Sequence, residues 1–276
     1  MAAGASAEDA NELCDLPMFK GRLCVAASNS PTAVTLSGDS DAIEQAREIL
    51  QDEEKFARVL KVDKAYHSPH MEKVAAGFLE GLRGCKIQPR HDTTGGPAWL
   101  SSTYTNTEMR GDMEGDRDLS GSYWVSNLLR PVLFSQAVQA AATAAQGPFD
   151  FAIEVGPHAA LKGPVLGTLG VNSDVEALPY VGLLHRGKDD VDTFGDALGA
   201  LWSRFSPSTV DFYTVDLSAS CALGRDLLKD LPTYHWDHDR LYWHESRMSR
   251  AVASAKNPPH PLLGARTTDV TEDEIR

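Results

Sequence analysis

The stretch LCVAASNSPTAVTLSGDS, residues 23–40, decides the fold class of this chain. Residues 23–27 and 33–36 are short apolar and β-branched runs, which predict two strands. Ser28-Asn29-Ser30-Pro31 lies between them and is typical of a turn, so we expect a hairpin. Gly38-Asp39-Ser40 should then end the second strand and cap a helix.

The sequence on both sides of this hairpin completes a recognisable order of elements. Ser6 is placed to cap a helix over residues 6–14, and apolar residues at helical spacing predict another helix after Ser40. Phe56 to Val62 reads as the next strand. The order α-β-β-α-β is that of a ferredoxin-like βαββαβ unit without its first strand, of which residues 1–4 would be the tail.

From residue 71 to residue 202, predicted helices and strands alternate. This alternation favours an α/β architecture with a largely parallel sheet. Pro131 is expected to open one of the helices as a first-turn residue. The predicted helices cover residues 71–82, 131–141, 159–169 and 191–202, the predicted strands cover 99–104, 149–155 and 180–184, and residues 111–121 read as a loop.

Composition excludes several classes of protein. The chain has 276 residues, a net charge of −13 and dispersed Lys and Arg residues, which argues against a nucleic-acid partner. No apolar run is long enough to span a membrane, and no secretory signal opens the chain. The 4 cysteines are scattered, which argues against a disulfide framework or a zinc knuckle. We therefore expect a cytoplasmic protein without a membrane partner.

The segment Ala65-Tyr66-His67-Ser68-Pro69-His70-Met71 resembles the histidine motif of the malonyl/acyl-CoA:acyl-carrier-protein transacylase family. The form is most similar to that of fungal highly reducing type I polyketide synthases. Further stretches agree with this family in order and spacing: residues 25–31 with 36–38, 123–128 with 131–134, 154–158 with Leu161, 231–243, and His260-Pro261-Leu262-Leu263-Gly264.

The resemblance implies a fold and a division into regions. The fold would be α/β, with an α+β small subdomain of ferredoxin-like type followed by the C-terminal part of an α/β-hydrolase-like large subdomain. Residues 1–63 would form the small subdomain with a truncated first strand, and residues 64–178 the part of the large subdomain. Residues 179–256 would form a post-acyltransferase linker, and residues 257–276 the start of a dehydratase domain.

The resemblance also assigns site residues. His67 would be the general base of acyl transfer, a task for which histidine suits because its ordinary pKa lies near neutrality. Tyr66 would help to size the pocket beside the acyl α-carbon and favour malonyl over methylmalonyl. The backbone carbonyl of Asn127 would hold the histidine ring in its useful tautomer. Without the family context, the same residues read as a capping or surface histidine, a packed tyrosine and a helix-entry asparagine.

One part of the family pattern is missing. The family carries its serine nucleophile in a Gly-His-Ser-x-Gly pentapeptide, which does not occur in this sequence. We therefore expect a fragment that is inactive alone. Within a whole synthase it would transfer malonyl from malonyl-CoA to an acyl carrier protein, beside ketosynthase and dehydratase domains. No cofactor or metal is implied, since the phosphopantetheine belongs to the carrier protein.

Three other interpretations remain open at this stage. Ser68 adjoins His67, but adjacent extended residues point apart, so we interpret Ser68 as a helix N-cap with Pro69 at the first helical position.

The chain could be a docking fragment or a pseudogene product, with the aromatic residues between Leu231 and Trp243 as its contact surface. A metal hydrolase is the third, with ligands from His67 and His70 or from His235, His238 and His244.

Overall fold

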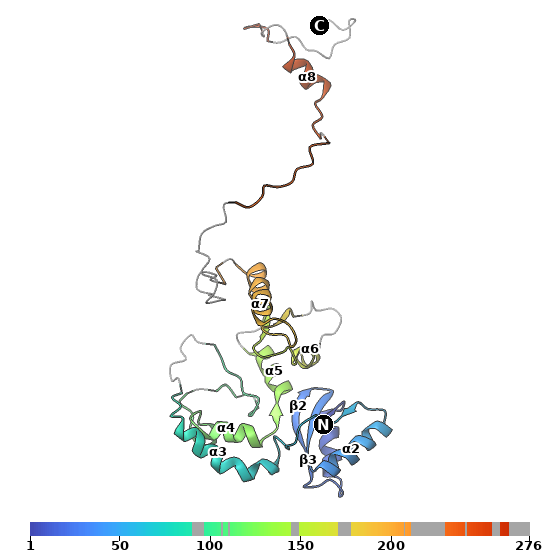
Figure 1. Ribbon diagram of the computed structural model, residues 1–276, viewed down its shortest axis with the longest axis vertical. Helices are drawn as coiled ribbons and strands as arrows, with labels where there is room; N and C mark the ends of the chain where they lie inside the picture. The colour runs from blue at the N-terminus through green and yellow to red at the C-terminus, as the bar shows by residue number, and fades with distance from the viewer. Residues whose placement is uncertain are drawn as a thin grey trace. The chain divides into compact units, whose positions relative to one another are not determined.

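The computed structural model divides into two units, Met1–Leu217 and Ser218–Arg276 (Figure 1). The described residues are 1–89, 97–105, 107–109, 111–144, 149–170, 178–206, 208–210, 230–240, 242–255 and 260–264. In the second unit they include helix α8, Arg247–Ala253, and a bridge between His260 and Gly264. Most of the expected dehydratase start, residues 257–276, lies outside the described residues.

The first unit begins with a ferredoxin-like sheet. Its strands lie in the order β4-β1-β3-β2, with β5 added beside β2. β1 pairs antiparallel with both β3 and β4, so residues 1–4 do supply the tail of the first strand as expected. The elements are β1 Ala2–Ala3, α1 Ala7–Asp15, β2 Leu23–Ser30, β3 Ala33–Gly38, α2 Ser40–Asp52 and β4 Ala57–Arg58.

Helices α1 and α2 pack on this sheet and bury one apolar core. Ala42 and Ala46 of α2 are fully buried, beside Val34 and Leu36 of β3. Phe19, in the loop after α1, is also fully buried. Burying one such large side chain contributes about 1.5–3 kcal/mol, so this core holds the small unit together.

The remaining chain of the first unit is built from helices with short parallel strands. β5 pairs parallel with β2, and β6 pairs parallel with β7. The elements are α3 Glu72–Gly84, α4 Ser122–Leu129, β5 Val132–Leu133, α5 Phe134–Thr143, β6 Ala152–Glu154, α6 Lys162–Thr168, β7 Tyr180–Gly182 and α7 Asp190–Arg204, with 3₁₀ turns at Pro69–Met71 and Gly115–Arg117.

Two predictions in the small unit were wrong in detail. Ser28, Asn29 and Ser30 belong to β2 and not to the turn, because register shifts in the β2–β3 pair let the strand run on to Ser30. The strand expected over Phe56–Val62 shrinks to Ala57–Arg58, since its partner β1 offers only Ala2 and Ala3.

The second half of the unit also corrects the sequence predictions. Residues 99–104 form no named strand and make a single bridge, Leu100 to Glu108, because Trp99 and Tyr104 pack on other aromatic rings instead. Pro131 precedes the short strand β5, and the following helix begins only at Phe134. Helix α4 was not predicted.

Apolar side chains of this half remain uncovered. The strand predicted over residues 149–155 shortens to Ala152–Glu154, and Ile153 and Val155 are 44% and 81% exposed. Helix α3 is amphipathic but buries none of its residues among those described. A sheet of two strands cannot cover such faces, so these surfaces are suited to packing against further protein.

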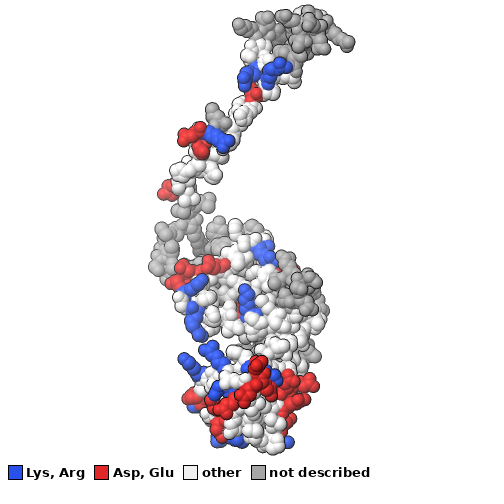
Figure 2. All heavy atoms as spheres, turned by 90° about the vertical axis from the view of Figure 1, so that its right-hand side faces the viewer, with Lys and Arg blue, Asp and Glu red and all other residues white. Residues whose placement is uncertain are grey.

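The small unit carries much of the negative charge. Figure 2 faces the side on which α2 lies and shows acidic side chains gathered there. Asp41, Glu44, Glu48 and Asp52 of α2 are all exposed. This face should repel an anionic ligand such as an acyl-CoA. Among the described residues, no helix is long and apolar enough to cross a membrane.

Candidate functional site

His67 lies in a tight turn between the small unit and α3. Ser68 is the N-cap of the 3₁₀ turn that follows, and its hydroxyl accepts a hydrogen bond from the His70 N–H. Pro69 occupies the first helical position, as the sequence predicted. The backbone of His67 has a φ of 57°, in the left-handed region that few non-glycine residues adopt. Such strain is characteristic of functional positions that their surroundings hold firmly.

Within the part of the chain that the structure describes, the ring of His67 is hydrogen-bonded through Nδ1. Its Nδ1 lies 2.9 Å from the carbonyl oxygen of Asn127 and 3.2 Å from that of Arg130. A carbonyl can only accept, so Nδ1 carries a proton, and in the neutral ring Nε2 then holds the lone pair. The His67 N–H also donates to the carbonyl of Leu128, at 3.2 Å. The C-terminal end of α4 thus fixes the orientation of the His67 ring.

The side chain of Asn127 has a partner that the sequence did not reveal. Its amide Nδ2 donates to Thr103 Oγ1 at 3.0 Å, inside α4 rather than at a helix entry. Tyr123, one turn earlier, is buried and shares a hydrogen bond of 3.1 Å with Ser101. These bonds fix the end of α4 to residues 101–103. In the sequence, only the hydroxyl residues Ser101 and Thr103 beside aromatic residues could have indicated these hydrogen bonds.

Arg130 anchors the same region from the outside. Its guanidinium pairs with Asp116 at 3.1 Å and lies over the ring of Tyr104, 4.8 Å from the centroid. Arg117 lies over the same ring at 5.0 Å. Burial raises the pKa of Tyr104, whose hydroxyl donates to Asp116. The Arg130 carbonyl is one of the two acceptors of the His67 ring nitrogen Nδ1. The cluster around Arg130 therefore supports the ring indirectly.

Two nearby groups could be mistaken for nucleophiles. Ser68 is 1% exposed, and its hydroxyl donates to the carbonyl of Ala65 at 2.6 Å, so it serves as a cap. Cys24 lies below the turn, with its Sγ 3.8 Å from the His67 carbonyl. Burial raises the pKa of the Cys24 thiol and therefore disfavours the reactive thiolate.

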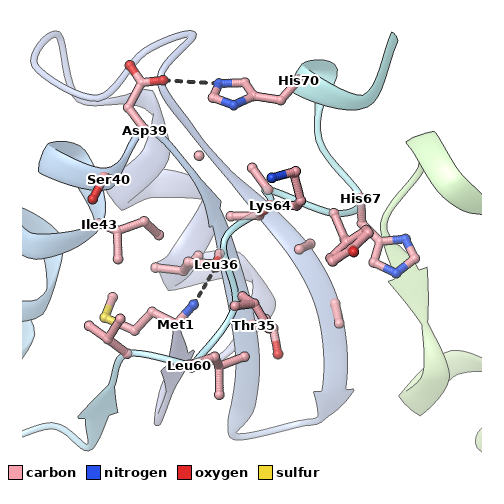
Figure 3. Close-up of a pocket in the computed structure, with 18 of the residues that line it drawn as sticks. Met1, Thr35, Leu36, Asp39, Ser40, Ile43, Leu60, Lys64, His67 and His70 are labelled. Carbon is pink, nitrogen blue, oxygen red and sulfur yellow. Dashed lines mark hydrogen bonds and ion pairs between the residues drawn. The ribbon is translucent and has the colours of Figure 1, made fainter. Parts of the chain in front are cut away.

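Tyr66 lies on a groove of about 700 Å³ between the sheet and residues 59–66 (Figure 3). Residues 36–39 line one side of this groove, and Val59, Leu60 and Val62 also line it. Tyr66 and His67 line this groove together, and the Tyr66 side chain is 46% exposed.

The segment Glu154-Val155-Gly156-Pro157-His158 makes structural contacts. The carboxylate of Glu154 accepts hydrogen bonds from the backbone N–H groups of Ala160 and Leu161 and, at 2.6 Å, from the Tyr180 hydroxyl. Burial and this carboxylate raise the pKa of Tyr180. Glu154 therefore ties β6 to β7 and to the turn before α6, while His158 packs edge-on against His185.

The histidines considered as metal ligands lie in other arrangements. His70 pairs with Asp39 at 3.0 Å instead of sharing a ligand set with His67. Among the described residues, no group of three or more His, Cys, Asp or Glu side chains could hold a metal ion.

Comparison with known proteins decides the family. Residues 1–202 match the acyl transferase domain family, which is more than half of the chain. The chain belongs to the acyl transferase domain family. Its ferredoxin-like sheet and the turn that carries His67 both lie inside the matched residues.

Relatives of this acyl transferase are fungal synthases. The chain is 57% identical over all 276 residues to the hybrid PKS-NRPS synthetase xenE of Xenoacremonium sinensis, of which it covers 7%. It is 49% identical over 279 aligned positions to the polyketide synthase-nonribosomal peptide synthetase phmA of Phaeosphaeria nodorum, covering 100% of this chain and 7% of that protein. The chain thus spans a small part of the length of its relatives.

Solved structures agree with this assignment of the fold. The acyltransferase domain from the second module of the salinomycin polyketide synthase has a TM-score of 0.60 at 24% identity, covering 74% of this chain and 43% of that one. A loading acyltransferase from the avermectin modular polyketide synthase has a TM-score of 0.55 at 26% identity, covering 72% and 57%. The predicted fold class and the resemblance to polyketide synthase acyltransferases are confirmed.

Proposed function

We propose that these residues supply the general base and the small subdomain of an acyltransferase that transfers malonyl from malonyl-CoA to an acyl carrier protein. The observation that carries the proposal is the geometry of His67. Two carbonyls bind its Nδ1, which leaves Nε2 as the proton acceptor. The roles of His67, Tyr66 and Asn127 remain predictions from family resemblance that this geometry supports.

The proposed chemistry has two half-reactions. In the first, Nε2 of His67 takes the proton of a serine hydroxyl while the serine oxygen attacks the malonyl thioester. The carbon–sulfur bond to CoA then breaks, and the departing thiolate receives the proton from His67. In the second, His67 takes the proton of the carrier's pantetheine thiol, whose sulfur attacks the malonyl ester. The carbon–oxygen bond to serine then breaks, and the serine oxygen receives the proton from His67.

The serine in this scheme is not among these residues, because the sequence holds no Gly-His-Ser-x-Gly segment. We propose that it lies in another part of a longer synthase, together with ketosynthase and dehydratase domains and the acyl carrier protein. The scheme itself uses no metal or redox cofactor. The chain by itself should therefore be inactive.

The test is substitution of His67 in the complete synthase. His67→Ala should lower malonyl transfer to the carrier protein by about 10²–10⁴-fold, the usual contribution of a positioned general base. Transfer is measured as malonylated carrier by mass spectrometry, with Asp190→Ala, an exposed residue in the first turn of α7, as the control. Full activity of the His67→Ala variant would refute the proposed role.

A further inference from the structure

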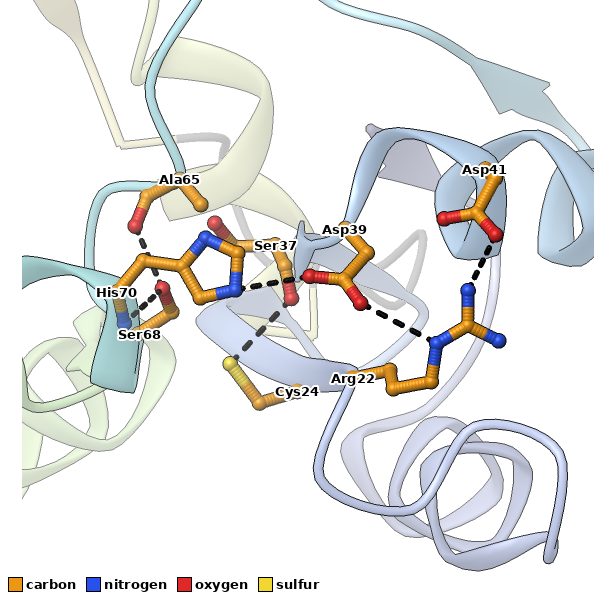
Figure 4. A network of polar contacts seen from close by, with 8 residues as sticks. All are labelled: Arg22, Cys24, Ser37, Asp39, Asp41, Ala65, Ser68 and His70. Atoms are coloured by element: carbon orange, nitrogen blue, oxygen red, sulfur yellow. Dashed lines mark hydrogen bonds and ion pairs between the residues drawn. The ribbon is translucent and has the colours of Figure 1, made fainter.

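His70 joins the turn that carries His67 to the small subdomain. Its Nε2 lies 3.0 Å from Oδ1 of Asp39, at the N-terminus of α2 (Figure 4). Because a carboxylate oxygen only accepts, Nε2 of His70 carries the proton in this contact. Asp39 and His70 face each other across one end of the groove in Figure 3, so the contact links two segments that are otherwise separate there.

The side chain of Asp39 makes this contact instead of capping α2. It is the N-cap of α2, with extended backbone angles, yet its side chain makes no capping hydrogen bond. An N-cap aspartate normally accepts from a backbone N–H two or three residues ahead, as Asp189 does at α7 with Val191 and Asp192. The Asp39 carboxylate binds His70 with one oxygen and Arg22 with the other, at 3.2 Å.

Arg22 and Gly38 fix the position of Asp39. The Asp39 N–H donates to the Arg22 carbonyl at 2.8 Å, and this approach requires a glycine before it. A Cβ on Gly38 would lie 2.0 Å from the Arg22 carbonyl oxygen. The Arg22 guanidinium also pairs with Asp41, whose pKa it lowers by hydrogen bonding. Asp39 is therefore a preset acceptor rather than a freely rotating side chain.

Ser68 connects the backbone of His70 to the residues that precede His67. Its buried hydroxyl donates to the Ala65 carbonyl and accepts from the His70 N–H, so one side chain closes the turn on both sides of His67. His67 itself sits at a φ of 57°, a conformation that relaxes unless both ends of the turn are held. Hydrogen bonds to carbonyls at the end of α4 hold His67 on one side of this turn. The His70–Asp39 contact holds the other side.

We propose that His70 and Asp39 are a positioning pair that orients the base His67 against the small subdomain, an inference that rests on the proposed function. The two side chains are 45% and 37% exposed, so the pair should contribute little to stability. Its effect should instead lie in the rate, because a misplacement of about 1 Å can cost as much as 10²-fold in catalysis.

The test uses four variants in the complete synthase. His70→Ala removes the donor, and His70→Gln keeps an N–H donor near the place of Nε2. Asp39→Ser restores an ordinary N-cap but cannot reach His70. The double variant His70→Ala/Asp39→Ser completes a cycle. The kcat and KM for malonyl transfer and the melting temperature are measured for each, with His67→Ala in parallel.

We expect His70→Ala and Asp39→Ser each to lower kcat by roughly tenfold, with KM within about twofold. The double variant should be no worse than either single one, and His70→Gln should recover most of the rate. Melting temperatures should stay within about 3 °C of the parent. Undiminished kcat in His70→Ala, additive losses, or failure of His70→Gln to recover would overturn the positioning pair. An active His67→Ala variant would instead overturn the proposed function.

Discussion

His67 combines a strained backbone with a ring that is held at one nitrogen. A left-handed φ of 57° in a residue with a Cβ costs on the order of 1–3 kcal/mol, which neighbouring contacts must offset. The carbonyls of Asn127, Leu128 and Arg130 supply those contacts on one side. These hydrogen bonds hold the strained backbone of His67 in place.

Tyr66 offers a test of substrate choice at the scale of one side chain. If its ring limits the space beside the acyl α-carbon, Tyr66→Ala should raise the methylmalonyl-to-malonyl ratio of kcat/KM by about tenfold, within the 1–3 kcal/mol that one methyl group can contribute. Competition between the two CoA esters in the complete synthase measures the ratio. Tyr66→Phe keeps the ring and should leave the ratio unchanged. A ratio that is the same in all three proteins would remove Tyr66 from the pocket.

Single residues differ in how well the sequence predicts their contacts. The sequence predicts Ser68 as the N-cap before Pro69, and the structure confirms the cap, although the capped element is the 3₁₀ turn Pro69–Met71 and α3 begins only at Glu72. The contacts of Asn127 with Thr103 and of His70 with Asp39 join segments far apart in the chain. No local pattern encodes them, because they depend on how the elements pack.

At the scale of elements, the small unit was the most predictable part. Its hairpin, its two helices and the tail of its first strand all follow from local patterns, and the strand order β4-β1-β3-β2 is that of a ferredoxin-like sheet. Element lengths were less predictable. β4 ends where its partner strand β1 ends, and the residues after Pro131 form β5, which pairs with β2. In both cases the pairing of strands overrides the local preference that the sequence indicates.

Gly38 tests the packing of this unit. Gly38→Ala should lower the free energy of unfolding by about 3 kcal/mol or more, since the added Cβ would meet the backbone of Arg22 and Leu23. Gly77→Ala is the matched control, because it lies inside α3 with no atom within 4 Å of the added Cβ. It should stabilise by about 0.5–1 kcal/mol. Denaturant unfolding compares the two, and equal stabilities would contradict the close approach of β3 to Arg22.

At the scale of the whole molecule, the uncovered faces agree with the comparisons. Val155, Ile153 and Phe149 present apolar surface from the segment around β6. The chain covers only 43% and 57% of the two solved acyltransferase chains described above. The aromatic residues expected to form a docking surface, such as Trp236 and Trp243, are also largely exposed. We therefore expect further protein to pack on these faces.

We propose that this chain carries the general base, His67, and that the serine nucleophile lies elsewhere in the synthase. The most direct measurement is incubation of the purified 276-residue chain with radiolabelled malonyl-CoA, followed by mass spectrometry of its peptides. The complete synthase serves as the positive control. We predict that the synthase acquires a malonyl ester while this chain acquires none. A malonyl ester on Ser68, or on any other residue of this chain, would contradict it.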